Sequence, residues 1–246
     1  MKISIISCGW YGTPLAQSLL KDGHEVLGAT RSEEKKLELQ NGGLVMSLLN
    51  FPDIPDQDLL DSSVIVLNIP PFKELLAWLE KWNWNQNSKI IFVSSTSVYK
   101  TTGEITETSP TEGDLAQIEN WVQQSFSHWV ILRFAGLIGD NRHPGKVLSG
   151  RKDLKGPQQP VNLIHRDDCI GFTKLVIEKN IDKEIYNVVS DEHHSRKEFY
   201  SEFCERKNLE KPSFDETDLS QGKLISNQKM SALYQLKFSR MIGKEL

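Results

Sequence analysis

The amino-acid sequence predicts an α/β protein built on a doubly wound parallel β-sheet. Short apolar runs alternate along the chain with segments whose apolar residues follow a helical spacing. These runs are continuous rather than alternating in polarity, as expected for strands that helices cover on both faces. A glycine-containing turn stands between the first run and the first helical segment, which is typical of the βαβ units that build such sheets.

The first 140 residues carry most of the expected sheet. Leu15, Ala16 and Leu19 share one face of the first helix. Ser32 can cap the second helix, and Gly42 follows its end. The expected strands are Ile3–Ser7, Glu25–Ala29, Leu44–Leu48, Val64–Leu67, Lys89–Val93 and Trp129–Arg133; the expected helices are Thr13–Lys21, Glu33–Gln40, Leu75–Trp82 and Asp114–Ser125.

The composition changes after Gly139, so we expect two parts, residues 1–140 and residues 141–246. Gly, Pro and basic residues fill 140–160, and short strands and helices follow. The second part is expected to be a small, mixed α/β lobe, of which about 160–190 returns to the sheet of the first part. Its expected strands are Val161–Ile164 and Ile185–Val189, and its expected helices are Asp167–Glu178 and Arg196–Lys207.

Composition excludes several classes of protein. The 246 residues carry a net charge of -4, and no basic face of the kind that binds nucleic acid is indicated. The three cysteines lie far apart, with no histidine spaced for a metal site, and are expected to be reduced thiols. No apolar run approaches the roughly 20 residues that span a bilayer. We therefore expect a cytoplasmic protein that binds neither nucleic acid nor membrane.

The turn Ser7-Cys8-Gly9-Trp10-Tyr11-Gly12 stands where the pattern GxGxxG belongs in a Rossmann-type dinucleotide site. Gly9 lets the backbone approach a pyrophosphate, Gly12 lets the helix pack close to the sheet, and the helix offers free N–H groups to phosphate. Ser7 replaces the first glycine, which loosens the match, and an ordinary tight turn is the alternative. We interpret residues 1–140 as a dinucleotide-binding Rossmann domain and 141–246 as mainly a substrate lobe.

Thr30 and Arg31 follow the second strand, where an Asp or Glu would bind the adenine ribose of NAD. Without a carboxylate a 2′-phosphate is not repelled, and a guanidinium can bind it through two charge-assisted hydrogen bonds. The sequence therefore favours NADP(H) over NAD(H). The alternative is an Arg31 that is merely solvated at a loop.

Four further segments, in order along the chain, extend the match beyond this turn. They are Phe92–Tyr99 (FVSSTSVY), Ile131–Gly139 (ILRFAGLIG), Val161–Asp168 (VNLIHRDD) and Tyr186–Val188 (YNV). With these segments the chain resembles the extended short-chain dehydrogenase/reductase family, in its NAD-dependent epimerase/dehydratase-like branch and particularly its atypical members. The resemblance covers nearly the whole chain.

The resemblance implies roles for several residues. Ser95, with Thr96 close behind, occupies the position of the hydroxyl that binds the substrate oxygen. Residues of the cofactor site would be Ser7, Gly9, Trp10, Tyr11, Gly12, Thr30 and Arg31, together with Asn68, Ile69 and Pro70 on the ribose and nicotinamide side. The second lobe would supply substrate contacts through Arg142, Asn162 and His165.

The chain departs from the family at its acid/base pair. The family uses a Tyr four residues before a Lys, which lowers the pKa of the phenol. No tyrosine here has a lysine at that spacing, and Thr111 and Leu115 stand at the expected positions. Tyr99 is the nearest substitute phenol, although the sequence favours a packing role for it over a catalytic one. A histidine can act as an acid or base in proteins, but for His165, at the end of a strand, a structural hydrogen bond is the favoured interpretation.

These observations leave two hypotheses open. The first is an NAD(P)-dependent oxidoreductase or epimerase/dehydratase that acts on a small polar substrate such as a nucleotide sugar. The second is a non-catalytic NADP(H)-binding protein that senses redox state or regulates a partner. Trp78 and Trp82 share a helix face, which predicts core packing or a subunit interface, so a homodimer is compatible with the sequence.

Overall fold

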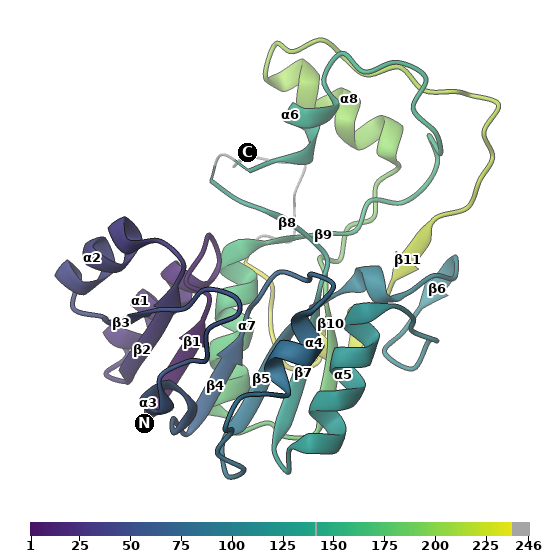
Figure 1. Ribbon diagram of the computed structural model, residues 1–246. Helices are drawn as coiled ribbons and strands as arrows, with labels where there is room; N and C mark the ends of the chain where they lie inside the picture. The colour runs from purple at the N-terminus through teal and green to yellow at the C-terminus, as the bar shows by residue number, and fades with distance from the viewer. Residues whose placement is uncertain (141, 238–246) are drawn as a thin grey trace. The chain divides into compact units, whose positions relative to one another are not determined.

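The computed structural model describes residues 1–140 and 142–237. Its central sheet has seven strands in the order β10-β7-β5-β4-β1-β2-β3 (Figure 1). β1 pairs in parallel with β2 and β4, β2 with β3, and β4 with β5. The strands are β1 Lys2–Ile6, β2 Glu25–Thr30, β3 Val45–Leu48, β4 Val64–Leu67, β5 Lys89–Ser95, β7 Trp129–Phe134 and β10 Glu184–Val188. The predicted doubly wound, Rossmann-type sheet is confirmed.

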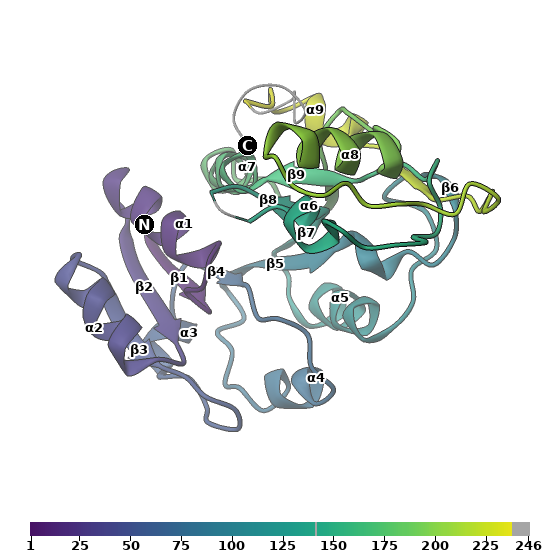
Figure 2. The ribbon, with the colours of Figure 1, turned by 90° about the horizontal axis from the view of Figure 1, so that it is seen from above.

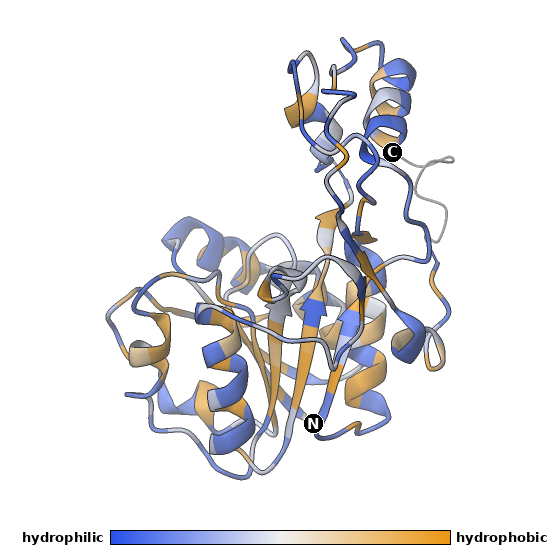
Figure 3. Cartoon of the chain, turned by 90° about the vertical axis from the view of Figure 1, so that its right-hand side faces the viewer, coloured by the Kyte–Doolittle hydropathy of each residue, from blue (hydrophilic) through white to orange (hydrophobic). Residues whose placement is uncertain are grey.

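Helices cover the sheet, and α1 and α5 present apolar faces to it. In α1 the side chains of Leu15, Ala16 and Leu19 are buried. Seen from above, α1 lies on one face of the strands, and α4 and α5 lie on the other (Figure 2). The strands are largely hydrophobic, whereas the helices carry both hydrophobic and hydrophilic residues (Figure 3). The helices are α1 Gly12–Lys21, α2 Glu33–Asn41, α3 Gln57–Leu60, α4 Leu75–Leu79, α5 Asp114–Ser125 and α7 Arg166–Glu178.

The main differences from the expected elements are short segments. The helix expected over Leu75–Trp82 ends at Leu79, because the next N–H groups, from Lys81 and Trp82, form tighter three-residue turns. The strand expected at Val161–Ile164 lies at Leu163–His165. In the described ranges no helix is long and apolar enough to cross a membrane.

The chain divides into two compact units. It passes between them several times, and not only near residue 140. Unit 1 comprises 1–98, 112–133 and 172–185; unit 2 comprises 99–111, 134–171 and 186–246. The segment 172–185 of unit 1 falls inside the stretch for which we expected a return to the sheet. Unit 2 contains β6 Gly103–Ile105, β8 Gly136–Ile138, α6 Pro144–Leu148, β9 Leu163–His165, α8 Arg196–Arg206, β11 Lys223–Ile225 and α9 Gln228–Ser231, with β11 parallel to β6 and β9 parallel to β8.

Tryptophans form a continuous part of the core of unit 1. Trp78 and Trp82 meet edge to face with ring centroids 4.9 Å apart, and Trp82 stacks on Trp84 at 5.1 Å. All three side chains are buried, which confirms the prediction of core packing for Trp78 and Trp82. Aromatic pairs of this geometry stabilise a core beyond the area they bury.

A buried ion pair joins α5 to two strands in unit 1. Glu119 on α5 and Arg133 on β7 are 1% and 3% exposed, and the Arg133 Nη2 to Glu119 Oε2 distance is 2.7 Å. The Nε of Arg133 also donates to both carboxylate oxygens. Ser94 on β5 donates its hydroxyl to the same carboxylate at 2.6 Å. Each charge is therefore compensated inside the protein, as burial requires.

We expect Glu119→Gln to lower the free energy of unfolding by about 3 kcal/mol, because it removes the carboxylate that faces a buried guanidinium. The measurement is urea unfolding followed by circular dichroism. The matched control replaces the network with apolar groups, as Glu119→Leu, Arg133→Met and Ser94→Ala together, and should recover most of the loss. A Glu119→Gln variant within about 1 kcal/mol of the parent would contradict this account.

His143 in unit 2 is a buried, neutral histidine. Its ring stacks on Phe203 with centroids 3.7 Å apart, and its Nδ1 accepts the N–H of Gly145 at 3.0 Å. The buried Nε2 has no hydrogen-bond partner in the part of the chain that the structure describes. Burial and the nearby charges of Lys146 and Lys207 lower the pKa of His143 to about 4.

This pKa predicts a loss of stability in acid. An unfolded histidine takes up a proton near pH 6.5, whereas folded His143 does so only near pH 4, so stability is complete above pH 6.5 and falls as pH drops toward 4. The expected loss is roughly 2 kcal/mol between pH 7.5 and pH 4.5. Unfolding of the parent and His143→Asn at both pH values measures it. Asn keeps an acceptor at the start of α6 but does not titrate, so an equal acid loss in both proteins would refute the assignment.

Candidate functional site

The turn between β1 and α1 depends on an unusual conformation at Ser7. Its φ is +80°, in the left-handed region that favours glycine, so serine adopts the conformation that the first glycine of the motif would take. The Ser7 carbonyl oxygen accepts the Gly9 N–H at 3.0 Å and the Asn68 side-chain amide at 3.2 Å. These bonds hold the strained residue in place.

The two glycines of the turn do different work. A Cβ on Gly12 would lie 2.4 Å from the Ser7 carbonyl oxygen, so only glycine allows α1 to begin this close to β1. A Cβ on Gly9 would meet nothing within 4 Å, and Gly9 lines an open cavity. Gly12 therefore serves packing, whereas Gly9 exposes its backbone to a ligand.

The cavity has a volume of about 680 Å³ and lies wholly within unit 1, at the carboxyl ends of β1, β2 and β4. Strand order reverses between β1 and β4, and ligands of open α/β sheets bind at this kind of switch point. One side of the lining is apolar and aromatic; the other contains the turn and a polar segment. The lining residues are Ile6, Ser7, Cys8, Gly9, Trp10, Ala29, Thr30, Arg31, Ser32, Lys35, Leu49, Phe51, Ile69, Pro70, Pro71, Phe72 and Trp78.

The charge of this lining is positive. Arg31 and Lys35 contribute the two cations, and the described lining contains no carboxylate. Thr30 is nearly buried, and its hydroxyl accepts the Ser32 N–H at 3.4 Å. Sequence reasoning found Arg31 but missed Lys35, because the lysine reaches the cavity only where α2 begins directly after β2.

The predicted cofactor residues divide into two groups. Seven line the cavity, and three support it from behind: Gly12 by its close approach, Asn68 by holding Ser7, and Tyr11 by a buried hydroxyl contact with Thr173 at 2.7 Å. The seven that line it are Ser7, Gly9, Trp10, Thr30, Arg31, Ile69 and Pro70.

Cys8 also lines the cavity, and its surroundings keep it unreactive. Burial raises the pKa of its thiol to about 12, against a smaller opposing effect of a backbone hydrogen bond with Ala29 and the charge of Lys35. The Sγ donates to the Ile5 carbonyl oxygen at 3.7 Å. A thiol held neutral at physiological pH is a poor nucleophile, so Cys8 serves as a small apolar wall.

The predicted catalytic hydroxyls lie at the end of β5, outside the lining of this cavity. Ser95 is half-buried, and its Oγ accepts the Ser97 N–H at 3.1 Å; within residues 1–140 and 142–237 no acceptor for its own proton is found. Thr96 is buried in the 3₁₀ turn Thr96–Val98 that follows. The hydroxyl of the neighbouring Ser94 donates its proton to the Glu119 carboxylate. Ser95 is therefore the better candidate of the two serines for a hydrogen bond to a substrate oxygen.

Tyr99 in unit 2 is fully buried, and its phenol donates to the Asn187 side-chain oxygen at 2.7 Å. The amide of Asn187 donates in turn to the Ser226 carbonyl oxygen at 3.2 Å. A phenol engaged in this way suits packing better than proton transfer. Thr111 pairs with Tyr99 through an isolated backbone bridge, and Leu115 lies in α5, so neither family position carries an acid or base.

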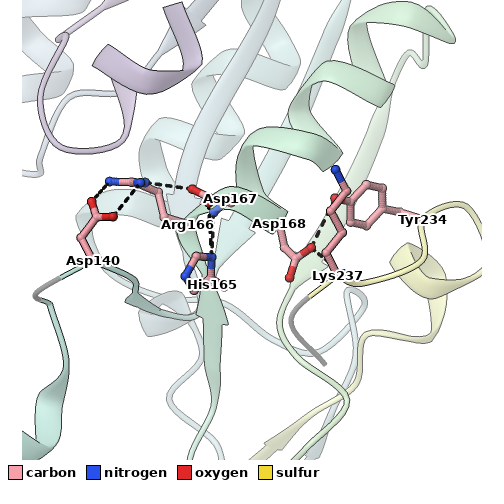
Figure 4. Close-up of polar contacts among 7 residues, drawn as sticks. All are labelled: Asp140, His165, Arg166, Asp167, Asp168, Tyr234 and Lys237. Atoms are coloured by element: carbon pink, nitrogen blue, oxygen red, sulfur yellow. Dashed lines mark hydrogen bonds and ion pairs between the residues drawn. The ribbon is translucent and has the colours of Figure 1, made fainter. Parts of the chain in front are cut away.

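The predicted substrate residues of unit 2 differ in what their side chains already do. The side-chain amide of Asn162 donates to the Lys223 carbonyl oxygen at 2.7 Å, and its oxygen accepts the Ile225 N–H at 3.1 Å. Both bonds hold β11 in place. Nδ1 of His165 accepts the Asp167 N–H at 3.2 Å (Figure 4). Arg142 has an exposed side chain.

Acidic residues near the start of α7 are also engaged internally (Figure 4). Arg166 forms ion pairs with Asp140 and Asp167. Asp168 is 1% exposed and accepts the Tyr234 hydroxyl at 3.3 Å and the Lys237 N–H at 2.8 Å. Burial and the Asp168 charge raise the pKa of Tyr234, which therefore remains a neutral donor. Sequence reasoning had no signal for this pairing across 66 residues.

Solved structures with the same fold cover nearly the whole chain. The human epimerase family protein SDR39U1, determined with NADPH, has a TM-score of 0.67 and 18% identity, over 98% of this chain and 96% of that one. The enzyme WbmH of Bordetella bronchiseptica, determined in complex with NAD+, has a TM-score of 0.72 and 16% identity, over 94% and 90% of the two chains. At these identities the likeness establishes the fold.

Sequence comparison gives a closer relationship. No sequence model of a known family matches the chain. Protein YeeZ of Escherichia coli (strain K12) is 30% identical over 254 aligned positions, which cover 93% of this chain and 92% of YeeZ. The chain therefore belongs to the same protein family as YeeZ, and its fold is that of the epimerase family protein and the other solved structures named above.

Proposed function

We propose that the cavity of unit 1 binds a nicotinamide dinucleotide, with NADP(H) preferred over NAD(H). The observation that carries this proposal is the pair of cations, Arg31 and Lys35, in a described lining without a carboxylate. A 2′-phosphate needs positive charge and an absence of acidic groups at this place, whereas the ribose diol of NAD needs an acidic acceptor. Related folds hold either nucleotide, so the preference rests on the residues of this cavity.

The remaining lining fits the other parts of such a ligand. The open backbone at Gly9 and the start of α1 suit a pyrophosphate. Leu49, Phe51 and Phe72 offer apolar and aromatic surface to a planar base. The volume of about 680 Å³ is in the range of cofactor sites.

We further propose that the chain acts as an oxidoreductase or epimerase/dehydratase on a small polar substrate such as a nucleotide sugar. A bound nicotinamide would supply hydride exchange with a carbon of the substrate. Ser95 would donate its hydroxyl proton in a hydrogen bond to the oxygen on that carbon, which orients it. Arg142 is our candidate for a contact with an anionic part of the substrate, because its charged side chain is exposed.

A second candidate function is a non-catalytic NADP(H)-binding protein that senses redox state. The burial of Tyr99 and its bond to Asn187 favour this alternative, since they remove the nearest substitute for the family's phenol. The Ser95 hydroxyl, whose proton has no acceptor among the described residues, favours the enzyme.

We expect the protein to bind NADPH at least tenfold more tightly than NADH, and Arg31→Ala to remove most of that difference. Trp10 and Trp78 line the cavity, so quenching of tryptophan fluorescence reports binding of both nucleotides. The variant should leave the Kd for NADH within about twofold, because NADH carries no 2′-phosphate. Equal affinity of the parent for both nucleotides would refute the preference.

Turnover separates the two candidate functions. We expect oxidation of NADPH, followed by its absorbance, with at least one compound in a panel of nucleotide sugars and small carbonyl compounds, and a fall of about a hundredfold in Ser95→Ala. Epimerisation without net change of cofactor is followed by chromatography of the sugar products. Tight NADPH binding with no turnover on any compound would favour the sensor.

A further inference from the structure

Two adjacent lysines in the first turn of α2 have different surroundings. Lys35 lines the cavity, and Lys36 is absent from its described lining. Lys35 is about one third exposed, with 34% of its side-chain surface accessible, and Lys36 is 25% exposed. The two side chains therefore have similar exposure but differ in their access to a ligand.

Each lysine is paired with a glutamate one turn away. Lys35 Nζ lies 3.1 and 3.0 Å from the two carboxylate oxygens of Glu38, and Lys36 Nζ lies 3.3 Å from Glu33. Both glutamates are more than half exposed. Exposed ion pairs of this kind contribute at most about 1 kcal/mol to stability. An anion of higher charge can therefore replace the glutamate as the partner of the lysine.

We propose that Lys35 is a second cation for the 2′-phosphate, beside Arg31, and that Glu38 competes for it and so sets the degree of preference for NADP(H). This inference rests on the proposed dinucleotide site. A phosphate monoester carries close to two negative charges at neutral pH, against one on Glu38, and it offers three acceptor oxygens. Lys35 therefore exchanges Glu38 for the phosphate when NADP(H) binds. Breaking the Lys35–Glu38 ion pair reduces the net free energy of binding.

The local charge balance explains why one arginine is insufficient. Glu33 and Glu34 occupy the first turn of α2, where they favour the helix but repel a phosphate. Lys35 offsets one of these charges from the cavity side. Ser32, which also lines the cavity, uses its hydroxyl oxygen to accept the Lys35 N–H at 3.2 Å and keeps its proton for a phosphate oxygen.

The test uses two ligands that differ only in this phosphate, adenosine 2′,5′-bisphosphate and adenosine 5′-monophosphate. Calorimetric titration gives the Kd of each for the parent, Lys35→Gln, Glu38→Gln and the double variant, at low and high salt. Lys36→Gln is the matched control, because it removes a neighbouring cation that is also paired with a glutamate but is absent from the described lining of the cavity.

We expect Lys35→Gln to weaken the bisphosphate about fivefold to tenfold and to leave the monophosphate within about twofold. Glu38→Gln should tighten the bisphosphate about twofold to threefold, and should have no such effect once Lys35 is Gln. Both changes should shrink at high salt. Lys36→Gln should leave the affinity for either ligand within about twofold.

The outcomes distinguish this inference from the proposed function. If the parent prefers the bisphosphate but Lys35→Gln keeps that preference, or if Lys36→Gln matches Lys35→Gln, the specific role of Lys35 is overturned while the site stands. If Glu38→Gln tightens the bisphosphate equally in the Lys35→Gln background, the competition is overturned. If the parent binds neither ligand, or binds both equally, the NADP(H) site itself is refuted.

Discussion

Several contacts that shape the cavity of unit 1 meet at the carbonyl oxygen of Ser7. It accepts hydrogen bonds from Gly9 and Asn68, and it leaves no room for a side chain on Gly12. These contacts join the ends of β1 and β4 to the start of α1. The turn can follow this path only because Ser7 adopts a φ of +80°. The open backbone at Gly9 and the adjoining cavity both depend on it.

A second fixed point lies at the end of β5. The carboxylate of Glu119 binds Arg133 and Ser94 together, so α5, β5 and β7 have one relative placement in unit 1. Ser94 is thereby turned inward, and the next residue, Ser95, alternates to the other side of the strand. The same buried charges that stabilise the unit therefore determine which of two serines keeps an available hydroxyl.

Hydrophobic periodicity was sufficient to predict the central sheet. The strand at Val64–Leu67 and the helix at Asp114–Ser125 lie where the pattern indicated, because each is a long or continuous apolar signal. Segments such as β6, β8 and α6 are three to five residues long, too short to show a period, and they form through pairing with distant partners. Their positions depend on tertiary contacts that a local pattern does not encode.

The candidate site could be predicted where the backbone geometry requires a particular residue type. It was harder to predict where a side chain can form hydrogen bonds with several different groups. Gly9 and Arg31 followed from the motif and from the end of the second strand. The serine at position 7 looked like a defect, yet it takes the conformation of the missing glycine. The hydrogen bond from the Asn68 amide to the Ser7 carbonyl oxygen was not predicted, because only the folded loop presents that oxygen. Lys35 required knowledge of where α2 begins.

Binding a dinucleotide and reacting with it make different demands on this chain. Binding needs space and positive charge, and the described part of unit 1 has both around one cavity. Reaction in this family also needs a proton donor whose pKa is tuned by a lysine, and here Thr111 and Leu115 stand in those positions. The nearest phenol, Tyr99, is tied to Asn187 by a bond that would have to break before proton transfer. Under the proposed enzyme function, Ser95 would orient the substrate oxygen and the proton would come from another group, whereas the proposed dinucleotide site needs no proton donor.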